Sequence, residues 1–159
     1  MKPNFTIHPV GTVERKNDMP FLVIDPEYRE ALLGLEDFSH VYVLCWADRL
    51  DSLEHRSVLH TLLPYAEGVS AGVFACRSPQ RPNPLLVSLC RVSSGDHGRG
   101  TVAVDEIDVF SGTPIIDLKP YYPVTDRVQQ ALIPAYLQGW PEWFPAEGIG
   151  LMPHELDLG

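Results

Sequence analysis

Apolar residues fall into short runs along this chain, and polar segments rich in Gly, Pro, Asn and Asp separate the runs. The runs at residues 6–14 and 21–24 flank the turn-prone segment 16–20, which predicts an opening β-hairpin. Residues 38–47 are apolar at nearly every position, which is typical of a strand covered on both faces. The pattern of the first part of the chain therefore predicts mainly β-structure.

Strand-like runs continue through the middle of the chain. We expect strands at residues 73–76, 85–92 and 101–109, with a Ser- and Gly-rich turn at 93–100 between the last two. Within residues 101–109 the apolar positions change phase, and this change predicts a β-bulge near Asp105 or Glu106.

Helical signals are fewer. Pro26 stands at the first turn of an amphipathic segment, 26–35, which predicts a short helix. Residues 55–63 fit a helix or a strand, and residues 125–137 fit a helix that Pro134 interrupts. Many short strands with one or two short helices are typical of a small, mainly β barrel.

Composition sets the number of domains. A chain of 159 residues that is 45% hydrophobic suits one domain with an ordinary core. We assign residues 1–124 to the barrel and residues 125–159 to a C-terminal extension. The extension carries Trp140, Trp143 and Phe144 between prolines and glycines, so it cannot form a regular amphipathic helix. Its apolar area must pack on its own domain, contact a partner subunit or cover the site as a lid.

Cysteine and histidine usage exclude two classes of site. Cys45, Cys76 and Cys90 lie in apolar runs without metal-ligand spacing, which predicts buried thiols in a reducing compartment. The spacing of His55 and His60 misses the i,i+4 geometry of a two-histidine metal site, so no metal is predicted. No apolar run reaches the roughly 18 residues that span a bilayer, and no signal peptide is evident. We therefore expect a cytoplasmic protein.

The most distinctive segment is a stiff loop that carries two cations. Pro79, Pro82 and Pro84 remove backbone donors and hold the preceding residues extended, so Arg77 and Arg81 are not helical neighbours. Guanidinium groups on such a pre-organised loop suit the binding of a carboxylate or a phosphate. The alternative is that both arginines pair with some of the chain's surplus carboxylates and only pin loops.

This loop also carries a resemblance to a known family. Residues 77–84, Arg-Ser-Pro-Gln-Arg-Pro-Asn-Pro, follow the run Gly-Val-Phe-Ala at 72–75 and resemble the signature of the TsaA-like family. That family includes S-adenosylmethionine-dependent tRNA methyltransferases of the TrmO type. The likeness continues at residues 34–44 and 111–123, and the chain is similar to a short, single-domain member.

The resemblance implies a β-barrel, S-adenosylmethionine as cofactor, a homodimer, and a strand within residues 55–63. It implies that Arg81, Asn83 and Tyr121 either meet the acceptor or fix the loop. The positions that would contact the methyl donor are Asp48, Arg49, Arg77, Val87, Val109, Phe110, Ser111 and Gly112.

No residue is assigned as the general base. The sulfonium of S-adenosylmethionine already activates the methyl group, so the protein mainly aligns donor and nucleophile. His40, Asp117 and Lys119 are the candidates. His40 fits a satisfied core histidine equally well, and Asp117 and Lys119 share one strand face, where they can simply pair with each other.

The acceptor is left with alternatives. The resemblance implies N-methylation of threonylcarbamoyl-adenosine beside the anticodon of tRNA, but a formal net charge of -9 disfavours a nucleic acid partner. Leu85 and Leu86 stand where the family usually has Ile-Gly, Ser111 stands where it has Asp, and the N-terminal segment is shorter. The alternatives are a methyltransferase for a small molecule and a non-catalytic barrel that has lost the donor site.

Overall fold

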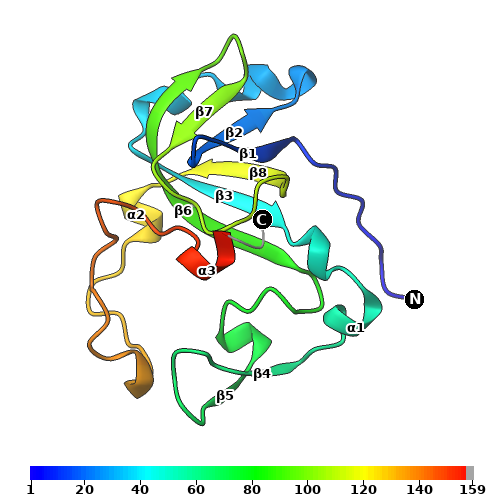
Figure 1. The fold of residues 1–159 in the computed structure, drawn as a ribbon, viewed down its shortest axis with the longest axis vertical. Coiled ribbons are helices and arrows are strands. Elements are labelled where there is room, and N and C mark those ends of the chain that lie inside the picture. Colours follow the sequence, from blue (N-terminus) through cyan, green and yellow to red (C-terminus); the bar gives the residue numbers. More distant parts are fainter. Residues whose placement is uncertain (157–159) are drawn as a thin grey trace.

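The computed structural model describes residues 1–156 and contains a closed antiparallel β-barrel, in the strand order β1-β2-β7-β6-β3-β8 (Figure 1). The predicted mainly β barrel is therefore confirmed. Its strands are β1 (Gly11–Lys16), β2 (Met19–Ile24), β3 (His40–Trp46), β6 (Leu85–Asp96), β7 (Thr101–Val104) and β8 (Pro114–Pro120).

The opening hairpin is formed by β1 and β2, as predicted. Asn17 and Asp18 both have positive φ, 51° and 64°, which matches the right-handed twist of a tight hairpin turn. The strand predicted over residues 6–14 begins only at Gly11. Residues 6–9 are exposed, and Pro9 has no N–H with which to join the ladder.

Side chains that alternate along the strands fill the barrel. In β3 the residues Val41, Val43 and Cys45 are fully buried, while the residues between them are half-buried on the outer face. Burying one such aliphatic side chain stabilises the fold by about 1.5–3 kcal/mol. The fully buried residues of the core cluster are Val13, Leu22, Val41, Val43, Cys45, Cys90, Val104, Ile107 and Ile115.

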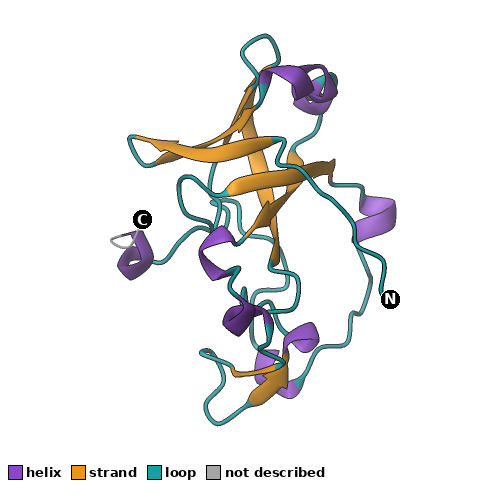
Figure 2. Ribbon diagram, turned by 90° about the vertical axis from the view of Figure 1, so that its right-hand side faces the viewer, coloured by secondary structure: helices purple, strands orange, loops and turns teal. Residues whose placement is uncertain are grey.

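A long excursion from the barrel separates β3 from β6. It contains α1 (Leu53–Arg56) and a two-stranded sheet of β4 (His60–Leu62) and β5 (Ser70–Gly72), which lies at one end of the molecule (Figures 1 and 2). Residues 55–63 thus divide between a helix and a strand. The strand predicted at 73–76 is wrong, because residues Val73–Ala75 curl into the 3-10 turn η4.

Two predictions about the β6–β7 hairpin need correction. β6 continues through Ser93 to Asp96, so the turn occupies only residues 97–100 and ends at Gly100, with φ 71°. No bulge lies near Asp105. β7 ends at Val104, so the phase change falls in the segment after the strand, and the irregularity in register lies on β6 between Val92 and Ser94.

The remaining helical elements are single turns. The predicted helix at 26–35 is the 3-10 segment η1, and the predicted helix at 125–137 is wrong because Gln130 has φ 53° and Pro134 breaks the segment. The elements are η1 (Pro26–Leu32), η2 (Leu35–Asp37), η3 (Asp48–Leu50), α2 (Pro123–Asp126), η5 (Ala135–Leu137) and α3 (Pro153–Leu156). None of the helices within residues 1–156 is long and apolar enough to cross a membrane.

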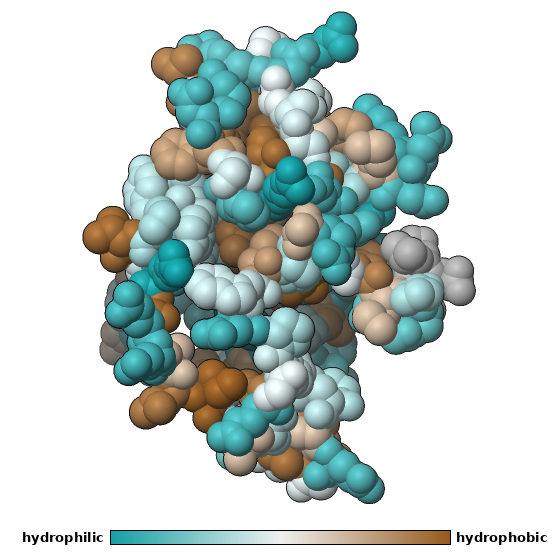
Figure 3. Space-filling model, turned by 90° about the vertical axis from the view of Figure 1, so that its left-hand side faces the viewer, coloured by the Kyte–Doolittle hydropathy of each residue, from teal (hydrophilic) through white to brown (hydrophobic). Residues whose placement is uncertain are grey.

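The segment after α2 runs along one side of the molecule and contacts both the barrel and the excursion (Figure 1). The Phe144 ring meets His40 of β3 edge-on, with centroids 5.5 Å apart, and the Trp140 ring meets Tyr65 near β4 at 5.2 Å. Trp140 nevertheless stays 54% exposed. Apolar residues gather in the lower half of this side (Figure 3).

Candidate functional site

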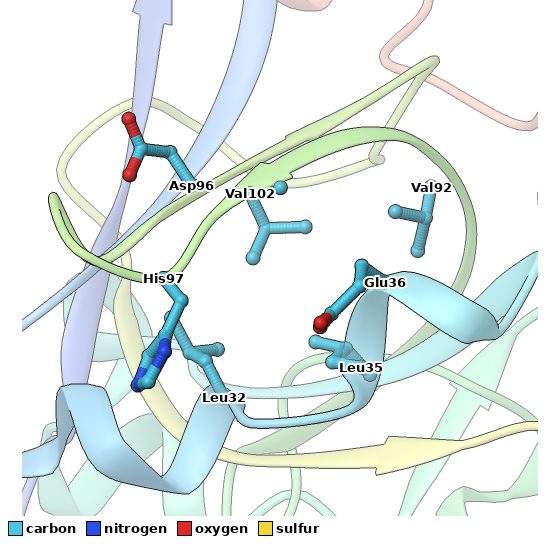
Figure 4. A pocket seen from close by; sticks show the side chains of 8 residues that line it. Leu32, Leu35, Glu36, Val92, Asp96, His97 and Val102 are labelled. Carbon is cyan, nitrogen blue, oxygen red and sulfur yellow. The ribbon is translucent and has the colours of Figure 1, made fainter.

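The described part of the molecule includes a smaller and a larger cavity. The smaller, of about 130 Å³, lies between η1, η2 and the β6–β7 turn (Figure 4). Leu32, Leu35 and Val102 give it an apolar lining, and the carboxylate of Asp96 points away from it. None of the site residues predicted from the sequence lines this cavity.

The larger cavity, of about 270 Å³, lies between the loop of residues 77–84, which we call the Pro-rich loop, β6 and the segment that follows β7. Predicted donor contacts from three separate segments meet here, namely Arg77, Val87 and Val109. Its complete lining is Arg77, Arg81, Leu85, Leu86, Val87, Ser88, Asp108 and Val109. We therefore take it as the candidate site.

One wall of the candidate site is a strand edge. Residues 85–91 of β6 pair with β3, whereas the pairing of β6 with β7 starts only at Val92. The edge of residues 85–88 that does not pair with β3 therefore faces the segment 105–113, and the cavity lies between the two. Backbone amide and carbonyl groups on such an edge can bind a planar polar ligand.

The second wall is the Pro-rich loop, which Arg81 holds in shape. Its guanidinium donates from Nε to the carbonyl of Ser78 at 2.9 Å and from Nη2 to the carbonyls of Cys76, at 2.7 Å, and Val73. Asn83 accepts a hydrogen bond from Arg56 at 3.2 Å. In this structure Arg81 and Asn83 thus fix the loop, which is one of the two roles that the sequence left open for them.

Arg77 and Asp108 bring opposite charges to the cavity. Arg77 is exposed and has no hydrogen-bond or ion-pair partner within residues 1–156. Asp108, from the segment after β7, accepts a hydrogen bond from the hydroxyl of Ser88 at 2.5 Å. A cavity with a guanidinium on one side and a carboxylate on the other is complementary to a zwitterionic ligand.

The remaining predicted donor contacts lie outside the cavity lining, on η3 and on the segment 105–113. The guanidinium of Arg49 stacks on the Phe110 ring, 4.6 Å from its centroid. Ser111 accepts a hydrogen bond from the backbone of Arg15, and Gly112 has φ 90°, which favours glycine there. Asp48 lies beside Arg49 in η3, where it is exposed.

A polar and aromatic patch lies on the outer face of the barrel. The outward residue Tyr42 of β3 pairs in register with Leu89 of β6 and Lys119 of β8. Lys119 and Asp117 form an ion pair at 3.0 Å, which is the alternative that the sequence left open for them. His40 shares this face and bonds through Nδ1 to the hydroxyl of Ser39 at 2.8 Å.

Tyr42 is a residue that the sequence analysis missed. Burial, then the charge of Asp126 and the neighbouring Tyr121 raise the pKa of its hydroxyl, while the charge of Arg77 lowers it. The ring of Tyr42 also lies 6.2 Å from that of Tyr121. The charge of Arg77, which lines the cavity, thus acts on this outward tyrosine. Its alternation with His40 along β3 was the available signal.

The described residues contain no group of three or more His, Cys, Asp or Glu side chains arranged to hold a metal ion. Cys45 and Cys90 are buried, Cys76 is half-buried, and all three are free thiols.

Comparison with known proteins supplies the context for this site. The family model for the tRNA-methyltransferase O N-terminal domain matches residues 8–127. A probable S-adenosyl-L-methionine-binding protein of Methanothermobacter thermautotrophicus is 38% identical over 136 residues, which cover 77% of this chain and 93% of that protein. The tRNA (adenine(37)-N6)-methyltransferase of Mus musculus is 34% identical over 105 residues, which cover 66% of this chain and 23% of the mouse protein.

Solved structures also resemble the fold. The crystal structure of TrmO from Pseudomonas aeruginosa matches with a TM-score of 0.65 and 26% identity over 85% of this chain and 62% of that chain. The present chain therefore spans less than two thirds of TrmO and about a quarter of the mouse enzyme.

Proposed function

This chain belongs to the tRNA-methyltransferase O N-terminal domain family, and from this premise we propose that it is a methyltransferase that uses S-adenosylmethionine. We place the donor in the 270 Å³ cavity. The observation that carries the proposal is the arrangement of Arg77 and Asp108, because the cavity offers opposite charges to a ligand that carries both a carboxylate and cationic groups.

Each wall of the cavity has a role in this proposal. Arg77 binds the carboxylate of the donor, and Asp108 accepts hydrogen bonds from its ammonium or ribose hydroxyl groups. The free edge of residues 85–88 binds the polar edge of the adenine, with Val87 and Val109 as apolar contacts. Asp48, Arg49, Phe110, Ser111 and Gly112 complete the donor site on the side of the segment 105–113.

The donor's sulfonium supplies the activated methyl group, so the residues of this chain mainly orient the two reactants and exclude water. Arg77 and Asp108 fix the two polar ends of the donor. Methyl transfer to an amine also requires a base that takes the proton of the acceptor, and His40, Asp117 and Lys119 on the outer face of the barrel remain the candidates.

The outer face is suited to a planar acceptor. Tyr42, Tyr121 and His40 present aromatic rings there, and such rings stack on nucleobases without regard to sequence. We therefore propose a modified adenine of tRNA, threonylcarbamoyl-adenosine beside the anticodon, as the acceptor. The name of the mouse relative, a tRNA adenine methyltransferase, supports this choice.

A small-molecule acceptor is the second candidate, and the net charge of -9 favours it, because a phosphate backbone is repelled by an acidic body. The two candidates differ in their response to salt. Turnover of tRNA falls steeply as ionic strength rises, whereas turnover of a neutral small molecule changes little.

The test of the acceptor is methyl transfer to tRNA in vitro. The purified protein is incubated with S-adenosylmethionine and tRNA from cells that lack the corresponding gene, and the nucleosides are separated by mass spectrometry. We expect methylated threonylcarbamoyl-adenosine with the natural chain and a large loss with Arg77→Met. If the protein binds the donor but forms no methylated nucleoside, tRNA is not the acceptor. If it binds no donor, the barrel is not catalytic.

We further propose a cytoplasmic homodimer. The three free thiols support a reducing compartment. Large apolar side chains are exposed on the excursion, among them Leu53, Leu62 and Phe74, and their exposure supports a subunit contact there. Light scattering after gel filtration tests this, because a mass of one chain at micromolar concentration would contradict the dimer.

A further inference from the structure

We propose that Arg15 is a positioning residue for the donor site: it fixes the segment 105–113, which we call the donor loop, in the shape that closes the cavity. The inference rests on the proposed function, since it assumes that this cavity binds the donor. Arg15 lies at the end of β1, outside the cavity lining, and belongs to none of the motifs noted in the sequence.

The contacts of Arg15 are concentrated on the donor loop. Its Nη2 donates to the carbonyl of Ile107 at 2.6 Å and to that of Val109 at 3.5 Å. Its backbone N–H donates to the hydroxyl of Ser111 at 3.2 Å. The side chain is only 12% exposed, so these bonds form where water does not compete strongly.

The residue between the two bonded carbonyls is Asp108. Holding the carbonyls of Ile107 and Val109 on one side of the loop fixes the backbone on both flanks of Asp108 and so orients its carboxylate toward Ser88 and the cavity. A loop in which these two carbonyls are unpaired and Asp108 is mobile would have to be ordered when the donor binds, and this ordering weakens the affinity. Arg15 therefore acts on the donor through the loop, without touching it.

Arg15 also connects the donor loop to the C-terminal extension. Its Nη1 lies 3.7 Å from the carboxylate of Glu106, at the start of the loop. The backbone of Gly148 and Gly150 packs directly on Glu106, where an added Cβ at Gly150 would collide with the carboxylate. The start of the loop is thus held from two sides.

A matched control lies at another part of the barrel. Arg29 in η1 also has a buried Nε without a hydrogen-bond partner in the described structure, and its stem packs on Gly100 beside the β6–β7 turn. Arg29 contacts neither the donor loop nor the larger cavity. Arg29→Met therefore removes a guanidinium whose Nε is buried from the same fold without disturbing the donor site.

The experiment compares donor affinity with stability in four proteins, namely the natural chain, Arg15→Met, Arg15→Lys and Arg29→Met. Calorimetric titration with S-adenosylhomocysteine gives the Kd, and thermal unfolding gives the Tm. We expect the Kd to rise at least tenfold in Arg15→Met, less in Arg15→Lys, which keeps one donor group, and not at all in Arg29→Met. Amide hydrogen exchange at residues 107–111 should become faster only in the Arg15 variants.

The outcomes separate this inference from the proposed function. If the natural chain binds the ligand and Arg15→Met binds it equally well, Arg15 has no positioning role and the inference is overturned. The same holds if Arg29→Met weakens binding as much as Arg15→Met, since the effect would then be general instability. If the natural chain binds neither S-adenosylmethionine nor S-adenosylhomocysteine, the proposed function is wrong, and this inference is wrong with the same result. If Arg15→Met does not fold, the Arg15→Lys result decides.

Discussion

Arg77 and Arg81 lie four positions apart in one loop, yet the fold gives their guanidinium groups opposite environments. Arg81 turns back onto the carbonyls of Val73, Cys76 and Ser78 and stabilises the loop from within. Arg77 extends from the loop into the cavity wall and has no partner within residues 1–156. One arginine therefore orders the loop so that the other can meet a ligand.

The first prediction concerns Arg77. A hydrogen-bonded contact with a charged group contributes about 1.5–3 kcal/mol, so Arg77→Met should raise the Kd for S-adenosylmethionine on the order of 10- to 100-fold. The Tm should change little, because the guanidinium has no partner within the described protein. Titration calorimetry measures the Kd. Arg99→Met, which removes an exposed arginine of the β6–β7 turn, is the control and should bind normally.

Arg81 should behave in the opposite way. Arg81→Met leaves the carbonyls of Val73, Cys76 and Ser78 without their donor, and such a loss costs about 1–3 kcal/mol of unfolding free energy. Urea denaturation followed by circular dichroism measures this change. A variant with the unfolding free energy of the natural chain would show that the loop keeps its shape without Arg81.

The buried thiols predict a dependence on pH. Burial, followed by the charge of Asp108, raises the pKa of Cys45 from 9.0 to about 12, and burial likewise raises the pKa of Cys90. The neutral thiols are therefore favoured by folding. Their stabilisation is complete below pH 9 and is lost as the pH rises toward 12. Urea denaturation at a series of pH values should show this decline, and Cys45→Ala with Cys90→Ala should reduce it.

Reactivity provides an independent check on these thiols. At pH 8 a disulfide reagent should modify only Cys76 in the folded protein, because Cys45 and Cys90 are both buried and un-ionised. After denaturation all three should react. Rapid reaction of all three thiols in the folded protein would contradict the buried positions of Cys45 and Cys90.

Among the elements, the strands that were predicted correctly are those that a short stretch of sequence specifies by its turn residues or its apolar run. The opening hairpin follows from the turn residues Asn17 and Asp18, and β3 follows from a continuous apolar run. η4 could not be predicted, because its curl coincides with hydrogen bonds from Arg81, several residues further along the chain. The helix expected at 125–137 failed because apolar periodicity does not detect a residue with positive φ.

The candidate site was predictable in part for the same reason. Arg77, Val87 and Val109 were proposed from motifs, and they line one cavity. Arg15 and Tyr42 were missed because their roles depend on the closed barrel, which brings β1 onto the donor loop and gathers Tyr42 with other aromatic rings on the outer face. Neither residue belongs to a motif, so only the tertiary structure identifies them.

The whole molecule combines an acidic body with a basic loop, and this combination predicts how salt affects each step. Contacts with phosphates make the affinity for tRNA fall steeply as the salt concentration rises. For each tenfold increase in salt, the affinity falls by nearly one power of ten for every phosphate that the protein neutralises. Donor binding neutralises no row of phosphates, so the Kd for the donor depends less on salt. Measuring the KM for tRNA and the Kd for the donor between low and physiological salt should show this difference. Equal insensitivity of both would favour a small-molecule acceptor.

The central claim is that the cavity between the Pro-rich loop, β6 and the donor loop binds S-adenosylmethionine. The most direct test is calorimetric titration of the purified protein with S-adenosylmethionine and with S-adenosylhomocysteine. We predict saturable binding of both ligands, with a Kd on the order of micromolar, about -8 kcal/mol, and one site per chain. The absence of binding heat for either ligand, at several temperatures and with a folded protein, would contradict the claim.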